Sequence, residues 1–471
     1  MRRLSLIILC MSLLGGCVEP TEFATGYASN ASPRDAARAA FAQATAGLGE
    51  KPLKGVVFAV YYPPAGFSPA TPEAYRIDAT AEAVAAEEIA ALCKTRGAVP
   101  NIGVRGRGIT REGVHLGRGI SVLAIFGGGE TKAALVPIKP DRKATASELV
   151  EVLRPMANLQ AVFAFGEMSL QFEPGADRAG FASTLTRGLS SRAMVFLAGG
   201  MNDPAATSDP LGSVQFYNGE AYTGGLAVMA IASPGMRLFS TTRHEFIPAD
   251  PAGVLTKVQR GWAVRIDGKP ALAVYRQRRG MAAEERLVPD SKYPIAINVG
   301  SRRYVTMVVD WVGRNGNDSH GQKSILPPGS MRFRQRVEEG SVIDILTGGD
   351  DATSIASSAA AAARRSVDTA LNGNAKPSLL WVGECHQRVS RWCHSAGFFG
   401  GVNPAEESIA LQSLRQTIDS RLAMDNRNAP RLPIFGIVGM GNFAPFGAEY
   451  KGADHVFQQN VVTATVLAHQ P

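Results

Sequence analysis

Short, nearly continuous apolar runs recur along this chain, without the polar alternation of a sheet that faces water on one side. They are GVVFAVYY (55–62), ISVLAIF (120–126), AVFAF (161–165), AMVFLA (193–198) and SLLWVGEC (378–385). A strand that is apolar on both sides needs cover on both faces of its sheet. We therefore expect sheets buried between other layers.

Segments with helical signals lie between these strands. Residues 79–97 are alanine-rich and end at a glycine, and residues 351–371 centre on SSAAAAARR. Ser32 before Pro33, and an Asn-Pro pair at the start of 403–422, are common helix beginnings. Strands and helices mixed at this spacing predict an α/β class, with two α/β domains of mixed, largely buried β-sheets flanked by helices.

The first residues, MRRLSLIILCMSLLGGCVEP, have the order of a signal peptide. The apolar run 4–14 is shorter than the roughly 20 residues that span a bilayer. The segment LGGC, ending at Cys17, resembles a bacterial lipobox, in which the cysteine is lipidated and becomes the mature N-terminus. We expect residues 1–16 to be removed and Cys17 to anchor the protein in the membrane; the alternative is a secretory signal with an incidental cysteine. Val18 is not the aspartate of inner-membrane retention, which favours the periplasmic face of the outer membrane.

Composition and length set the organisation behind this leader. Residues 17–32 are polar and turn-rich, which indicates a flexible tether. The remaining length exceeds one hydrophobic core, so we expect two domains. Removing the leader lowers the formal charge from +8 to +6, and the basic residues are scattered apart from YRQRRG and RFRQR. No nucleic-acid motif is present, so nucleic acid is not an expected partner.

Three cysteines remain once Cys10 and Cys17 are assigned to the leader and the anchor: Cys93, Cys385 and Cys393. An odd number in an oxidising compartment leaves at least one free thiol.

The stretch WVGECHQRVSRWCH, residues 381–394, raises several possibilities. Cys385 ends a buried strand, where ligands bind in α/β sheets, so it could line a site or be an inert core thiol. A turn after it would permit a disulfide with Cys393. The Cys-His spacing does not fit zinc, and we predict no metal site and no cofactor. A cysteine nucleophile would need a base brought near by the fold, so catalysis stays open and a binding role is favoured.

Five segments carry a resemblance to a known family. They are PNIGVRGRGITREGVHLGRGISVLAIFGGG (100–129), VFLAGGMNDPAATSDPLGSVQFYNGEAYTGGLAVMAI (195–231), GWAVRIDGKPALAVYRQ (261–277), GECHQR (383–388) and IFGIVGMGNFAPFG with QQNVVTATVLA (434–447 and 458–468). Together and in this order they resemble the FIST family, the paired N- and C-terminal FIST domains of bacterial sensory proteins.

The resemblance implies an N-terminal FIST domain at 33–262 and a C-terminal FIST domain at 263–468. It also implies a sensor of a small molecule, such as an amino acid or a similar metabolite, bound near the domain junction. This chain has no kinase, cyclase or methyl-accepting module, so the protein partner that would receive a signal is undefined. Val104 and Ile109 occupy places where the family usually has a cysteine and a glutamate, and Asn442 stands where the family has a glutamate. The loss of an acid at Asn442 favours an anionic ligand.

The resemblance and the strand-end rule together give the expected ligand-binding residues. They are Cys385, Arg388, Gly441, Asn442, Gly199, Gly200, Asn202 and Asp203. The paired glycines allow close backbone approach to a ligand, and the arginine fork suits a carboxylate. Two alternatives are a cysteine-dependent enzyme on the same scaffold and an envelope scaffold protein without a small ligand.

Overall fold

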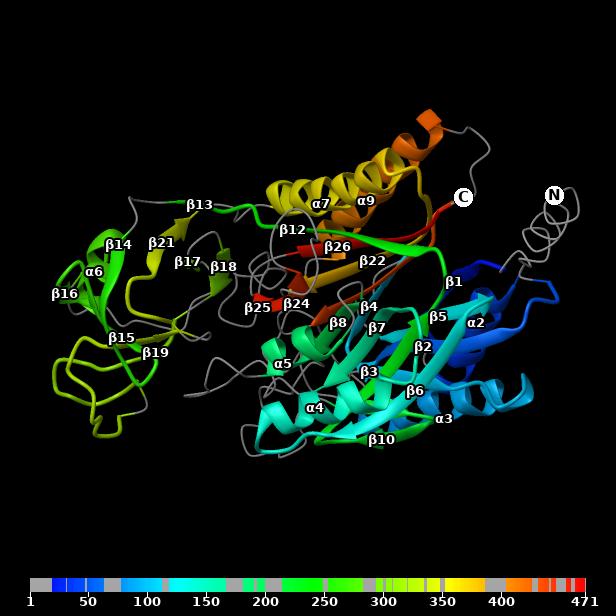
Figure 1. Ribbon diagram of the computed structural model, residues 1–471, viewed down its shortest axis with the longest axis horizontal. Helices are drawn as coiled ribbons and strands as arrows, with labels where there is room; N and C mark the ends of the chain where they lie inside the picture. Colours follow the sequence, from blue (N-terminus) through cyan, green and yellow to red (C-terminus); the bar gives the residue numbers. More distant parts are fainter. Residues whose placement is uncertain are drawn as a thin grey trace, which may run out of the picture.

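The computed structural model describes residues 19–470 apart from short gaps. The residues outside the description are 31, 47–48, 63–77, 112–117, 167–180, 190–192, 200–213, 249–252, 283–293, 300–301, 307, 320, 334–336, 348–351, 386–403, 426–430, 440–441, 446–454 and 459–461. The chain forms a body of three helix-covered sheets and a lobe that projects from it (Figure 1).

The first sheet is built from the N-terminal part of the chain. Its strands, in spatial order, are β1 (Thr21–Ala28), β5 (Gly119–Gly127), β2 (Leu53–Tyr61), β3 (Asn101–Arg105), β9 (Gln215–Tyr217) and β10 (Glu220–Tyr222). Helices α2 (Pro33–Thr45) and α3 (Ala79–Thr95) pack on one of its faces. The Ser32 side chain accepts a hydrogen bond from the Asp35 N–H at 3.2 Å, which confirms the predicted cap of α2.

The second sheet combines strands from both ends of the chain. Its order is β25 (His455–Gln458), β24 (Asn442–Pro445), β8 (Met194–Gly199), β7 (Leu159–Gly166), β11 (Gly225–Ala232) and β6 (Glu130–Pro137). Helices α4 (Arg142–Leu153) and α5 (Phe181–Gly188) cover its outer face.

The third sheet is also composite. Its order is β12 (Met236–Arg243), β26 (Val462–His469), β22 (Lys376–Cys385), β23 (Ile434–Gly439) and β4 (Arg107–Thr110). The predicted long helices form: α7 (Ala352–Asn372) and α9 (Pro404–Asp425) lie side by side on its outer face (Figure 1).

The lobe, residues 247–347, is a mainly β unit with its own core. Its strand order is β18 (Arg302–Thr306), β17 (Ile295–Val299), β21 (Val342–Thr347), β14 (Gly253–Gln259), β15 (Trp262–Ile266), β20 (Met331–Phe333) and β19 (Val308–Trp311), with β13 (Ile247–Pro248) on β21 and β16 (Lys269–Pro270) on β15. The apolar segment near residue 271 is a helix, α6 (Ala271–Arg278).

The inner faces of the three body sheets share one hydrophobic core. Within it Trp381 of β22 contacts Phe163 and Phe196 of the second sheet, with ring centroids 5.0 and 5.4 Å apart, and Phe435 of β23 at 5.7 Å. These aromatic contacts join the second and third sheets. The α/β class with mixed, helix-flanked sheets is therefore confirmed, and the buried faces explain why the strands are apolar on both sides.

The structure bears on two expectations about the organisation of the chain, the tether at 17–32 and the boundary at 262–263. Residues 17–32 are not a tether throughout, because residues 21–28 are strand β1, paired with β5 along its whole length. Thr, Phe, Thr and Tyr stand at every second position of this strand; Thr21 and Phe23 among them are buried, and Gly26 on the opposite face is buried against α2. The expected boundary between 262 and 263 falls inside β15, after its first residue, Trp262. Strands β4 and β24 also pair with strands of the other expected half.

No described helix is long and apolar enough to cross a membrane. The leader, including Cys10 and Cys17, lies outside the described residues.

Candidate functional site

The chain crosses from the first sheet to the third within three residues. Arg105 ends β3, Gly106 follows, and Arg107 begins β4. Arg107 lies opposite Val438, the residue before the last one of β23. A Cβ atom at Gly108 would come within 2.5 Å of the Ser121 hydroxyl, so the two sheets approach closely here. The carboxyl ends of β3 and β23 are therefore neighbours.

A second crossing joins the third sheet to the second. Cys385, the last residue of β22, lies opposite Gly439, the last residue of β23. After residues 440 and 441 the chain re-enters a sheet at Asn442, which lies opposite Ala198 of β8. The carboxyl ends of β22, β23 and β8 thus meet in one region.

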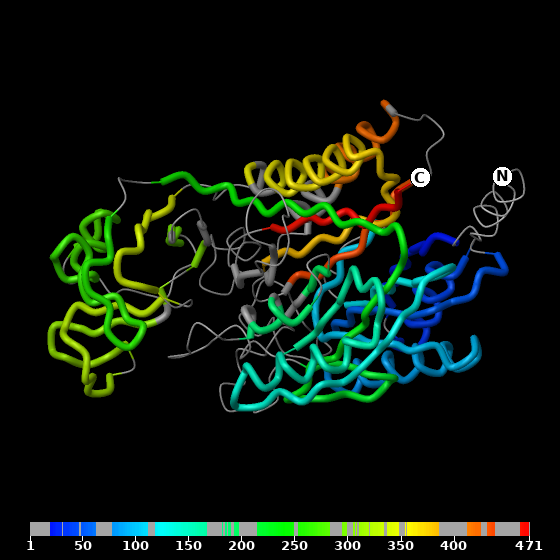
Figure 2. The backbone as a smooth tube through the Cα atoms, viewed as in Figure 1, coloured from blue at the N-terminus to red at the C-terminus, as the bar shows by residue number. Residues whose placement is uncertain are grey.

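This region lies at the end of the body that faces the lobe. Strand β22 runs antiparallel to β26, and β26 leads to the C-terminus at the opposite end of the body (Figures 1 and 2). Polar side chains at the carboxyl ends of several strands are the usual place for a ligand in an α/β protein, because the following loops are free to vary. We name this region the strand-end site.

The predicted ligand-binding residues divide into two groups. Cys385 is buried and is a free thiol, at the position expected for it. Asn442 and Gly199 are placed by their strands: Asn442 is opposite Ala198, the residue before Gly199. Cys385 and Asn442 belong to different sheets, which the crossing at residues 440–441 connects.

The other predicted contacts lie outside the described residues. They are Arg388, Gly200, Asn202, Asp203 and Gly441, together with Cys393. Their contribution to a site therefore stays a prediction.

The sequence interpretation missed the charged side chains of this region. Arg107 is 1% exposed, and its guanidinium lies over the ring of Tyr61, 5.4 Å from the centroid. Glu82, in the first turn of α3, is fully buried and accepts a hydrogen bond from the Arg105 Nε at 2.6 Å. Arg105 is therefore paired with Glu82, and Arg107 adds a second buried cation next to Gly106.

Burial sets the protonation behaviour of Glu82. It raises the pKa of the Glu82 carboxyl to about 7, against the opposing effects of Arg105 and of the Tyr62 backbone N–H. The charge and hydrogen bonds of these partners favour the ionised form, whereas loss of water favours the neutral form and is the larger effect. Glu82 consequently changes charge near neutral pH.

The signal for these residues was present in the sequence. The segment GVRGRGI places two arginines inside an otherwise apolar strand pattern, and such arginines are rarely buried without a role. Val104 and Ile109 occupy the places where the FIST family usually has a cysteine and a glutamate, and both are buried apolar residues here.

Two observations concern metal ligation and the other described thiol. The described residues contain no group of three histidine, cysteine, aspartate or glutamate side chains that could hold a metal ion. Burial raises the pKa of the Cys93 thiol to about 12, which makes this cysteine a poor nucleophile.

Comparisons with known proteins point to one family. No curated protein matches the chain. Two Thermotoga maritima structures align with 96% of this chain and 72% of their own: PurL complexed with ATP, at 9% identity and a TM-score of 0.22, and phosphoribosylformylglycinamidine synthase II, at 10% and 0.19. Such low TM-scores support no conclusion. The family model described as FIST N domain matches residues 76–269, less than half of the chain. This match supports the FIST family, a family of sensory domains, over the residues that it covers.

Proposed function

We propose that this protein is an envelope-anchored sensory lipoprotein of FIST type, which binds a small, polar, anionic metabolite at the strand-end site. A sensory, ligand-binding role is what the FIST N match supports in general. The choice of ligand rests on how β4 and β22 pair with β23. This pairing places Arg107 next to the end of β23 and Cys385 opposite that end.

The charge of this region favours an anion. Arg105 and Arg107 flank Gly106 and are both buried. Arg105 is paired with Glu82, so Arg107 is the arginine that we assign to the ligand. The guanidinium of an arginine is always charged and presents a planar fork that fits a carboxylate. With Asn442 where the family has an acid, the loop between β23 and β24 adds no negative charge at this point. Amino-acid-like carboxylates fit these features best.

A thermal-shift screen of the chain without its leader tests this proposal. The probes are amino acids, dicarboxylates and, as the opposing class, polyamines. A ligand present at about 100 times its dissociation constant stabilises the folded state by about 2.7 kcal/mol. Stabilisation by carboxylates and not by polyamines is the expected result. Stabilisation by polyamines alone contradicts the anion assignment.

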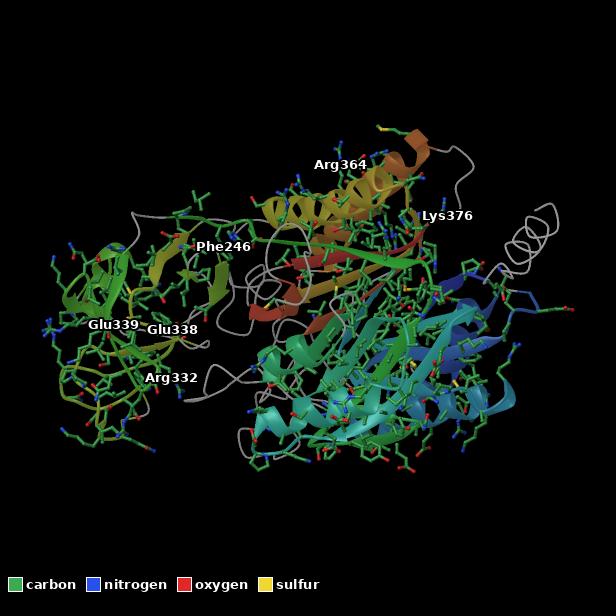
Figure 3. The ribbon with its side chains drawn as sticks, in the orientation of Figure 1. Phe246, Arg332, Glu338, Glu339, Arg364 and Lys376 are labelled. Carbon is green, nitrogen blue, oxygen red and sulfur yellow. The ribbon has the colours of Figure 1, made fainter. Side chains whose placement is uncertain are left out.

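Replacing Arg388 by alanine should weaken binding of the carboxylate found in that screen by about 1.5–3 kcal/mol, the scale of a hydrogen bond to a charged group. Isothermal titration calorimetry measures the effect. Arg364→Ala is the matched control: Arg364 lies on the outer face of α7, and its side chain is 61% exposed (Figure 3). Equal affinities of the two variants would remove Arg388 from the site.

Replacing Cys17 by serine should abolish lipidation, because only a thiol accepts the diacylglycerol. The basis is the LGGC segment after the apolar run of the leader. Incorporation of labelled palmitate and partition into the membrane fraction are the measurements. Cys10→Ser, a change of the same kind within the leader, should leave both unaltered. If the wild-type protein takes up no palmitate, the anchor proposal is wrong.

A further inference from the structure

The positive charge of this protein is concentrated in the lobe. Residues 247–347 contain 16 lysines and arginines and 10 aspartates and glutamates, a net charge of +6. The whole chain has a net charge of +8, and Arg2 and Arg3 of the leader account for two of these charges. Residues 17–246 and 348–471 are therefore neutral as a group. The lobe is the basic part of an otherwise balanced protein.

Three acidic side chains in the described part of the lobe are engaged within it. Asp267 accepts hydrogen bonds from the Val254 N–H and from Arg278. Asp310 accepts from the backbone and hydroxyl of Ser319, and Asp318 accepts from the Gln322 N–H. These carboxylates hold turns in place, and their ion pairs are with Arg278 and Arg332.

The exposed cations of the lobe have no acidic partner in the part of the chain that the structure describes. They are Lys257, Arg260, Arg265, Lys269, Arg314 and Lys323. Lys257 and Arg265 are directly opposite each other on β14 and β15. Like charges in this position destabilise a sheet. An anionic surface next to this pair of cations would reduce their repulsion and stabilise the arrangement.

Exposed apolar residues accompany these cations. Ile325 is 73% exposed and lies two residues after Lys323, in the loop between β19 and β20. Hydrogen bonds to Asp310 and Asp318 hold this loop, so Ile325 is presented by ordered structure. Val254 on β14 is 40% exposed.

The cations and Ile325 lie on neighbouring elements of the lobe. Lys257, Arg260, Arg265 and Lys269 lie on the paired strands β14, β15 and β16 and in the turn between the first two. Arg314, Lys323 and Ile325 lie in the loop that leads to β20, which pairs with β15. Strands β14 and β16 and helix α6 form the end of the lobe away from the body (Figures 1 and 2). Basic side chains around an exposed aliphatic residue are the combination that binds a lipid surface, since the cations are attracted to headgroups and the apolar side chain enters the interface. An acidic protein face would not need the exposed isoleucine.

We propose that the distal end of the lobe docks on a surface of anionic phospholipid. The docking surface consists of the six cations named above together with Ile325. It is separate from the strand-end site, and it does not require a ligand there.

Co-sedimentation with vesicles tests the proposal. The chain is used from Val18 on, which keeps every described helix and strand and leaves out the leader and the lipid-bearing cysteine. We expect binding to vesicles of phosphatidylcholine mixed with phosphatidylglycerol, and none to phosphatidylcholine alone. Binding should disappear at roughly 0.5 M salt, where screening is strong.

Two sets of variants locate the surface. The triple variant Lys257→Gln, Arg260→Gln, Lys323→Gln should lower the partition coefficient by about 100-fold. Ile325→Ser should lower it by about tenfold, through loss of one inserted side chain. The matched triple variant Lys94→Gln, Arg96→Gln, Lys143→Gln removes three exposed cations from the body and should bind as the unmodified chain does. Equal thermal unfolding of all variants shows that the fold is intact.

Two results overturn the proposal. One is equal vesicle binding by the lobe triple variant and the body triple variant. The other is failure to bind anionic vesicles at low salt, whether or not the chain binds polyglutamate beads. Capture on polyglutamate without vesicle binding assigns the surface to an acidic protein instead.

Discussion

Replacing Glu82 by alanine should lower the free energy of unfolding by about 3–5 kcal/mol, because it leaves the buried guanidinium of Arg105 without its carboxylate. Urea denaturation at pH 8, followed by circular dichroism, measures the loss. Glu88→Ala is the control on the same helix. Glu88 is 11% exposed and pairs with Arg34 and Arg38, whose side chains are 57% exposed. These arginines stay hydrated when the carboxylate is removed, so the loss should be about 1 kcal/mol, well below that of Glu82→Ala.

The double variant Glu82→Leu, Arg105→Met makes this test sharper. Removing both charges together avoids the unpaired ion, so the double variant should be much closer in stability to the wild type than Glu82→Ala. If the double variant is as unstable as Glu82→Ala, the loss is due to packing and not to the buried charge.

Glu82 should also give the protein a pH-dependent stability. Its pKa is about 7 in the folded state and near the ordinary glutamate value when unfolded. Between these values the folded state holds a proton that the unfolded state has released, so this group makes the free energy of unfolding fall as the pH rises from about 4.5 to 7. Glu82→Gln should flatten that part of the pH profile, and an unchanged profile would contradict the raised pKa.

Replacing Trp381 by alanine should destabilise the protein by about 3–5 kcal/mol, the cost of emptying a large aromatic position in a core. Trp381 is 3% exposed and contacts Phe163, Phe196 and Phe435 across two sheets. The loss should therefore affect the body as a whole. Denaturant unfolding followed by near-ultraviolet circular dichroism measures it.

Met424→Ala is the control for the tryptophan variant, since Met424 is 77% exposed and should change stability by less than about 0.5 kcal/mol. A loss of less than 1.5 kcal/mol for Trp381→Ala would mean that the two sheets do not depend on this contact.

Local signals in the sequence predicted most of the elements, because apolar runs and helix caps act within a few residues. Helix α2 begins at Pro33 as its cap requires, and β22 ends at Cys385 as its apolar run indicates. Strand β1 was missed, although it alternates with a period of two, because its polar composition resembles that of a linker.

Pairing between distant segments could not be predicted in the same way. Strand β4 pairs with β23, and the nearby hydrogen bond from Arg111 to the Leu432 carbonyl joins residues 321 positions apart. Nothing in either segment specifies the other. For the same reason the sequence did not predict that Arg107 lies next to the end of β23. The position of Cys385 at the end of a strand could be predicted, because it follows from the apolar run directly before it.

The position of β26 bears on how this chain can be made. Strand β26 lies between β12 and β22, near the end of the sequence, so the third sheet lacks an internal strand until these residues are available. During synthesis, β12 and β22 are made before β26, and their edges stay unpaired until it forms. Contacts of such high sequence separation form slowly. Until β26 is in place, the unpaired edges and apolar faces of these strands favour aggregation.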